Sequence, residues 1–106
     1  MAVEIFEAIL EQLSAEHKQL SSGKMMSSPA IHYKGKVLAF FSRKETMVFK
    51  LGKDYPVETL KVRVEIFSPF KSKKPFSGWY EVSQKDSASW LSICELALTI
   101  AKNNFM

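Results

Sequence analysis

The residues that most often carry chemistry are few in this chain of 106 residues and do not gather in its sequence. His17 and His32 are the only histidines, and neither has an acidic or cysteine partner at a metal-ligand spacing such as i and i+4. The single cysteine, Cys94, lies among apolar residues of a predicted helix, where a thiol packs as a small hydrophobe. We therefore expect no metal site, no disulfide within the chain and no cofactor.

The polar residues also lack a spacing that suits acid–base or nucleophilic catalysis. Glu65 and Glu81 are the one pair of carboxylates that could face each other across adjacent strands, as a cross-strand charge site rather than an acid and a base. The four glycines are spread singly, so they form no glycine-rich phosphate-binding loop. We expect that the protein is not an enzyme and has no catalytic residue.

A basic and aromatic segment between residues 61 and 80 is the best candidate for nucleic-acid binding, because positive charge attracts phosphates and exposed rings stack on unpaired bases. If residues 60–67 form a strand, alternation places its first two basic side chains on one face, next to a loop rich in lysine. The alternative, which we favour, is that Trp79 belongs to the core and the lysines form a solvated loop. The candidate residues are Lys61, Arg63, Lys71, Lys73, Lys74, Trp79 and Tyr80, with Phe70 and Phe76 nearby.

A second candidate surface is the apolar strand predicted between two tight turns. Alternation predicts that Leu38 and Phe40 point to one face and that Val37 and Phe41 point to the other. Both faces are therefore apolar, and a small two-layer fold covers only one of them with helices. The predicted interaction face consists of Leu38, Phe40 and Phe41, and its partner is an unknown protein or a second copy of the chain.

The predicted helices follow from apolar residues at steps of three and four. One helix runs from Val3 to about Leu20 and is ended by Gly23. A last helix begins after a cap at Asp86 or Ser87. Residues 55–60 predict one short helical turn, with Pro56 near its start.

The predicted strands number five. Residues 30–51 form three antiparallel strands joined by turns at residues 33–36 and 42–45. Strict alternation at residues 60–67 predicts a half-buried fourth strand. Residues 78–82 form the fifth.

The composition is that of one globular domain spanning residues 1–106, with 46% hydrophobic and 25% charged residues. No apolar run approaches the ~20 residues that cross a bilayer, and glutamates stand near the start where a signal peptide is basic. We expect a cytoplasmic protein without a membrane partner. The net charge of +4 favours an acidic partner only slightly.

Short motifs along nearly the whole chain resemble one known family. They are Lys24-Met25-Met26, Gly35 to Phe40, Val48 to Leu51, Phe67-Ser68-Pro69, Trp79 to Val82, and a closing helix with Trp90 and Ala97-Leu98. In this order they resemble the N-terminal domain of the TfoX/Sxy family, although Met26 and Ser27 stand where that family usually has phenylalanine and glycine.

The resemblance implies an α+β fold of two layers, with a five-stranded antiparallel sheet packed by helices in the order α-βββ-α-ββ-α. Full-length members regulate competence for DNA uptake and carry a second, C-terminal domain, so that role transfers poorly to this sequence. We expect a non-enzymatic protein-interaction or regulatory module, with homodimer formation as one form of interaction. The alternative is a nucleic-acid-binding protein that uses the segment from Lys61 to Tyr80.

Overall fold

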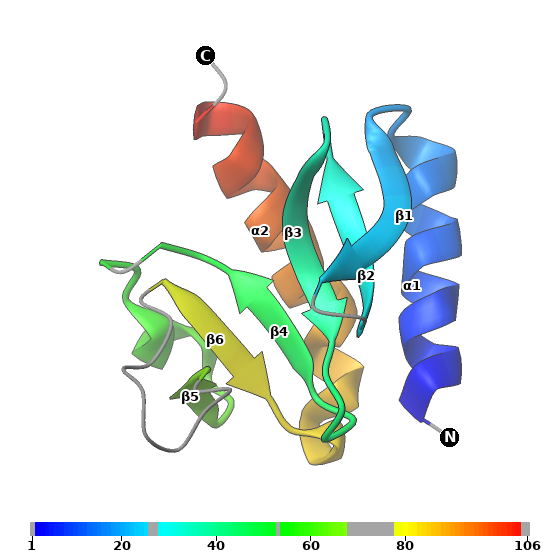
Figure 1. Ribbon diagram of the computed structural model, residues 1–106. Helices are drawn as coiled ribbons and strands as arrows, with labels where there is room; N and C mark the ends of the chain where they lie inside the picture. The colour runs from blue at the N-terminus through cyan, green and yellow to red at the C-terminus, as the bar shows by residue number, and fades with distance from the viewer. Residues whose placement is uncertain (1, 26–27, 53, 68–77, 105–106) are drawn as a thin grey trace.

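The computed structural model describes residues 2–25, 28–52, 54–67 and 78–104. Within these ranges the chain forms a six-stranded antiparallel sheet and two α-helices, α1 (Ala2–Glu16) and α2 (Trp90–Asn104), which share a core with one face of the sheet (Figure 1). The predicted α+β class with an antiparallel sheet is confirmed. The sheet has six strands where five were predicted.

The strands lie in the order β1-β2-β3-β4-β6-β5, so the chain leaves the sheet after β4 and returns with β6 between β4 and β5. Every neighbouring pair is antiparallel. The bounds are β1 (Leu20–Met25), β2 (Ser28–Tyr33), β3 (Lys36–Phe41), β4 (Met47–Lys50), β5 (Val64–Ile66) and β6 (Trp79–Val82).

The first helix is shorter than predicted, because residues 17–19 form a turn and Leu20 begins the edge strand β1. The Leu20 N–H donates to the His17 carbonyl in a turn that redirects the chain after α1 ends. Leu20 is buried in the core although it belongs to a strand. In the sequence it continues the apolar spacing of the helix, which is why the helix was predicted to be longer. Gly23 does not end a helix but lies in β1, paired with Ala30.

The predicted strand at residues 60–67 is also shorter, because its first half is a turn. Residues Val57–Leu60 form the 3-10 helix η1, which confirms the predicted helical turn. Lys61 follows with a φ of 60°, a left-handed conformation that reverses the chain. Only Val64–Ile66 pairs as β5, although the burial of residues 60–64 does alternate.

Both predicted tight turns are present. Lys34 and Gly35 have φ values of 51° and 84°, the two left-handed residues that a tight β-hairpin turn needs between β2 and β3. In the β3–β4 turn the Ser42 N–H donates to the Thr46 carbonyl at 2.8 Å. Glu45 takes the left-handed position there with a φ of 61°.

The main core fills the space between the sheet and the two α-helices. Phe41 contacts Phe6 of α1 and Trp90 of α2, with ring centroids 5.8 and 6.2 Å apart. The Trp90 Nε1–H donates to the Val82 carbonyl at 3.3 Å, which satisfies its buried polar atom. The cap before this helix lies at Ser83, which precedes the 3-10 helix η2 (Gln84–Ser89), and not at the predicted Asp86 or Ser87.

Candidate interaction surfaces

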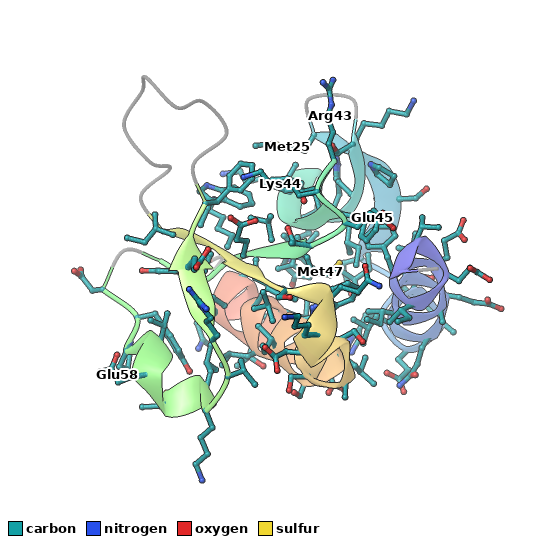
Figure 2. The ribbon with its side chains drawn as sticks, turned by 90° about the horizontal axis from the view of Figure 1, so that it is seen from below. Met25, Arg43, Lys44, Glu45, Met47 and Glu58 are labelled. Carbon is teal, nitrogen blue, oxygen red and sulfur yellow. The ribbon has the colours of Figure 1, made fainter. Side chains whose placement is uncertain are left out.

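The second face of the sheet, which we call the helix-free face, carries no α-helix of the described residues. One row of paired residues crosses it from β1 to β5, and Figure 2 shows Met25, at the end of β1, on the side away from α2. The row changes from apolar to acidic between β4 and β6, so this face has an apolar half and a polar half. The residues of the row are Gly23, Ala30, Phe40, Val48, Glu81 and Glu65.

Aromatic rings fill the apolar half. Phe40 is buried there and meets Phe67 edge to face at 5.2 Å and Trp79 at 5.8 Å between centroids. The Lys50 ammonium lies 5.9 Å from the centre of the Trp79 ring, within reach of a cation–π interaction. Trp79 is half-buried, so the rings of this cluster bury most of their apolar surface against one another.

The polar half surrounds a cavity of about 420 Å³. The Thr46 hydroxyl donates to Glu81 Oε2 at 2.9 Å and therefore accepts from the Ser42 hydroxyl at 2.7 Å. Arg63 pairs with Glu65 at 3.2 Å in an exposed position. Glu65 pairs with Glu81 across the strands, as predicted.

The predicted interaction face does not exist as a surface, because Leu38, Phe40 and Phe41 are all buried. Leu38 and Phe41 belong to the main core beneath the helices. Phe40 alone belongs to the cluster on the helix-free face. The prediction that Leu38 and Phe40 share a face is therefore wrong.

A β-bulge at Leu38 explains this difference. Its neighbours Val37 and Ala39 pair with consecutive residues of β2, so Leu38 is an extra residue without a partner in that strand. An extra residue shifts the alternation of side chains by one position. Leu38 therefore joins Ala39 and Phe41 on the helix side, and Val37 stays with Phe40.

The predicted nucleic-acid residues do not form one patch among the described residues. Tyr80 points into the main core and its hydroxyl donates to the Gly52 carbonyl at 3.2 Å, whereas Trp79 points to the opposite face. Lys61 directly follows η1 and Arg63 precedes β5, so neither residue lies on a strand and the predicted shared strand face does not form. The remaining candidates, Lys71, Lys73, Lys74, Phe70 and Phe76, lie outside the described residues.

The cysteine and the histidines have structural surroundings. Burial raises the pKa of the Cys94 thiol to about 12, with a smaller effect from the Glu95 carboxylate, so the thiol stays protonated at neutral pH. His17 Nδ1 lies 3.4 Å from Lys102 Nζ at the surface. The His32 ring packs over Gly23, and its buried Nε2 has no hydrogen-bond partner among the described residues.

The free edge of β1 is a surface that the sequence did not reveal. The Gln19 carbonyl accepts from the Lys34 N–H, which shows that the odd-numbered residues of this segment hydrogen-bond to β2. The N–H and C=O groups of Ser22 and Lys24 therefore point away from the sheet. Both side chains are exposed, and in the described part of the chain no strand pairs with this edge.

An acidic helix lies beside this edge. Helix α1 runs along β1 (Figure 1) and contains four glutamates and no lysine or arginine. Glu7 and Glu11 are exposed and form no ion pair with any described residue. Serine and glycine have little preference for strands, so the sequence of β1 does not predict a strand. Only its pairing with β2 identifies it as the edge of the sheet.

The described residues contain no group of three or more histidine, cysteine, aspartate or glutamate side chains that could hold a metal ion. Nor does any helix within these ranges have the length and apolar character to cross a membrane. Comparison with protein-family models, with curated proteins and with solved structures found no match to this chain.

Proposed function

We propose that the protein is a non-enzymatic protein-interaction module that binds an extended segment of a partner along the free edge of β1. The observation that carries this proposal is the six-residue edge strand with outward backbone groups at Ser22 and Lys24. A partner strand that pairs with this edge hydrogen-bonds these groups, each bond contributing about 0.5–1.5 kcal/mol. Such binding needs no catalytic residue.

The charge beside β1 favours a basic partner. A segment added to this edge comes to lie near α1, whose exposed glutamates give that side of the molecule a negative potential. Lysine or arginine in the segment therefore increases its affinity, whereas aspartate or glutamate reduces it. A regulatory role of the kind that the TfoX resemblance implies is compatible with this mode of binding and belongs to the proposal.

Two labelled peptides test the proposal by fluorescence anisotropy at near-physiological salt. Both are eight residues long, one alternating valine with lysine and the other alternating valine with glutamate. We expect the basic peptide to bind and the acidic peptide to bind at least tenfold more weakly. Ser22→Pro, which removes an N–H that points outward and spares the bonds to β2, should weaken binding of the basic peptide about tenfold.

Ser22→Ala is the matched control, since it removes the same hydroxyl and keeps the N–H. It should bind the basic peptide as the wild type does, and thermal unfolding should show that both variants are folded. Equal affinities of Ser22→Pro and Ser22→Ala would exclude strand addition at β1. Sedimentation tests whether the partner is a second copy of the chain. If the wild type and Ser22→Ala form a dimer and Ser22→Pro does not, the β1 edge binds a second copy instead of another protein.

A further inference from the structure

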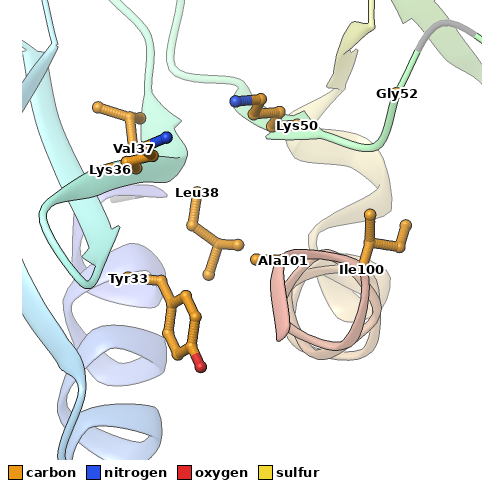
Figure 3. A pocket seen from close by; sticks show the side chains of 8 residues that line it. All are labelled: Tyr33, Lys36, Val37, Leu38, Lys50, Gly52, Ile100 and Ala101. Carbon is orange, nitrogen blue, oxygen red and sulfur yellow. The ribbon is translucent and has the colours of Figure 1, made fainter. Parts of the chain in front are cut away.

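A second, smaller cavity of about 100 Å³ lies where β3 and β4 separate above α2 (Figure 3). The two strands pair from Phe41 and Met47 as far as Ala39 and Phe49, and there the pairing ends. The bulge at Leu38 bends β3 at this point, so the strands diverge instead of continuing the ladder. This cavity is distinct from the β1 edge and independent of the function proposed for it.

The lining of the cavity is apolar below and positively charged at its rim. Leu38 of β3 and Ile100 and Ala101 of α2 form its apolar part. Lys36 and Lys50 approach the cavity from the two diverging strands, and both are exposed. Lys50 forms no ion pair with a carboxylate of the described residues, and its ammonium group lies 5.9 Å from the centre of the Trp79 ring.

The backbone of Lys50 belongs to the ladder between β3 and β4, so only its side chain is available at the rim. The Leu51 N–H donates to the Gly78 carbonyl at 3.0 Å, which shows that odd-numbered residues of β4 bond to β6. The N–H and C=O groups of Lys50 therefore point toward β3. Their partner in the ladder is Leu38, because the Ala39–Phe49 pair lies between the positions Phe40–Val48 and Leu38–Lys50.

We propose that this cavity binds a small free monocarboxylic acid with an aliphatic tail of about four carbons. The two lysines at the rim suit a carboxylate, and the apolar floor suits the tail. A cavity of roughly 150 Å³ holds a six-carbon ring in another protein, so about 100 Å³ holds a tail of about four carbons. Pentanoate has this length.

Pentanoate titrated into the folded protein tests the site, with the amide ¹⁵N–¹H shifts as readout. We expect saturable shifts around Leu38, Lys50 and Ala101 and a dissociation constant of roughly 1 mM, the range of such small ligands. Acetate, which has no tail, and 1-pentanol, which has no charge, should each bind at least tenfold more weakly. Equal binding of pentanoate and pentanol would overturn the proposal.

Three variants locate the binding. Lys50→Gln should weaken pentanoate at least fivefold, whereas Lys44→Gln, at the distant β3–β4 turn, should leave its affinity unchanged. Ala101→Leu, which fills the cavity from α2, should abolish binding in a protein whose spectrum remains that of the folded chain. Wild-type affinity in Lys50→Gln, or no saturable shift in the wild type at 50 mM pentanoate, would exclude the site.

A last comparison identifies the source of the carboxylate. N-acetyl-glycyl-leucine presents a carboxylate next to a four-carbon side chain at the end of a peptide. We expect it to bind more weakly than pentanoate, because its acetyl-glycyl group exceeds what a cavity of about 100 Å³ can hold. Binding at least tenfold tighter than pentanoate would overturn the assignment to a free acid.

Discussion

His32 packs against Gly23 on the neighbouring edge strand, and this contact explains why β1 contains a glycine. A Cβ atom at Gly23 would lie closer than van der Waals contact to three atoms of the imidazole ring. A glycine in a strand often marks such a close approach, and a ring over it restores part of the lost packing. The absence of a side chain at residue 23 is therefore required by the side chain at residue 32.

Gly23→Ala should lower the free energy of unfolding by about 1–2 kcal/mol, because the new methyl group forces the His32 ring to move. In the background of His32→Ala the same substitution should be close to neutral, since the ring is gone. Chemical denaturation of the wild type, both single variants and the double variant measures this coupling. Strictly additive effects would show that the two residues do not interact.

At the scale of one element, the β3–β4 turn has a residue whose type does not suit its backbone conformation. Glu45 occupies a left-handed position, with a φ of 61°, which glycine adopts without steric cost. The turn forms nevertheless, because Ser42 Oγ accepts from the backbone N–H groups of Lys44 and Thr46, both at 3.2 Å. Side-chain hydrogen bonds thus stabilise a turn whose residue types are not ideal.

Glu45→Gly should raise the free energy of unfolding by about 0.5–1 kcal/mol, since it relieves the left-handed strain at that position. Lys44→Gly is the matched control: its φ is not positive, so glycine there should destabilise the turn. Urea denaturation of both variants gives the comparison. The same sign of change in both would contradict a special role for the conformation of Glu45.

At the scale of the whole molecule, charge and exposed apolar surface are distributed unevenly. The chain has a net charge of +4 although α1 contains four glutamates and no basic residue. The positive charge therefore lies outside α1, and part of it is at the β3–β4 turn, where Arg43 and Lys44 are exposed (Figure 2). Of the aromatic residues predicted to stack on bases, the two that the structure describes, Tyr80 and Trp79, lie on opposite faces of the sheet.

This distribution predicts that the protein does not bind nucleic acid at near-physiological salt. Stacking needs exposed rings, whereas Tyr80 is buried and Trp79 packs on Phe40. Fluorescence anisotropy of labelled single-stranded and duplex DNA and RNA, at low and near-physiological salt, tests this. Binding that persists at near-physiological salt would favour the nucleic-acid function instead. In that case, replacing Lys71, Lys73 and Lys74 by alanine should lower the salt dependence of the binding constant by up to about three units of slope.

The sequence by itself determined the elements that are specified locally. Helix α2 follows from its apolar spacing, and β2, β3, β4 and β6 follow from apolar or aromatic runs next to glycine and polar turns. The facing carboxylates of Glu65 and Glu81 also followed from alternation in two adjacent strands. For each of these helices and strands, a short stretch of chain contains the whole pattern.

The tertiary structure decided the features that depend on a neighbouring strand. Residues 20–25 form a strand only because β2 pairs with them, and their serines and glycine have no strand preference of their own. The bulge at Leu38 exists only as a difference in register between β2 and β3, yet it places Leu38 and Phe40 on opposite faces of the sheet. Both candidate sites, the edge of β1 and the cavity between β3 and β4, arise where pairing between strands stops. Where pairing stops is a property of two strands together, and neither strand's sequence contains it.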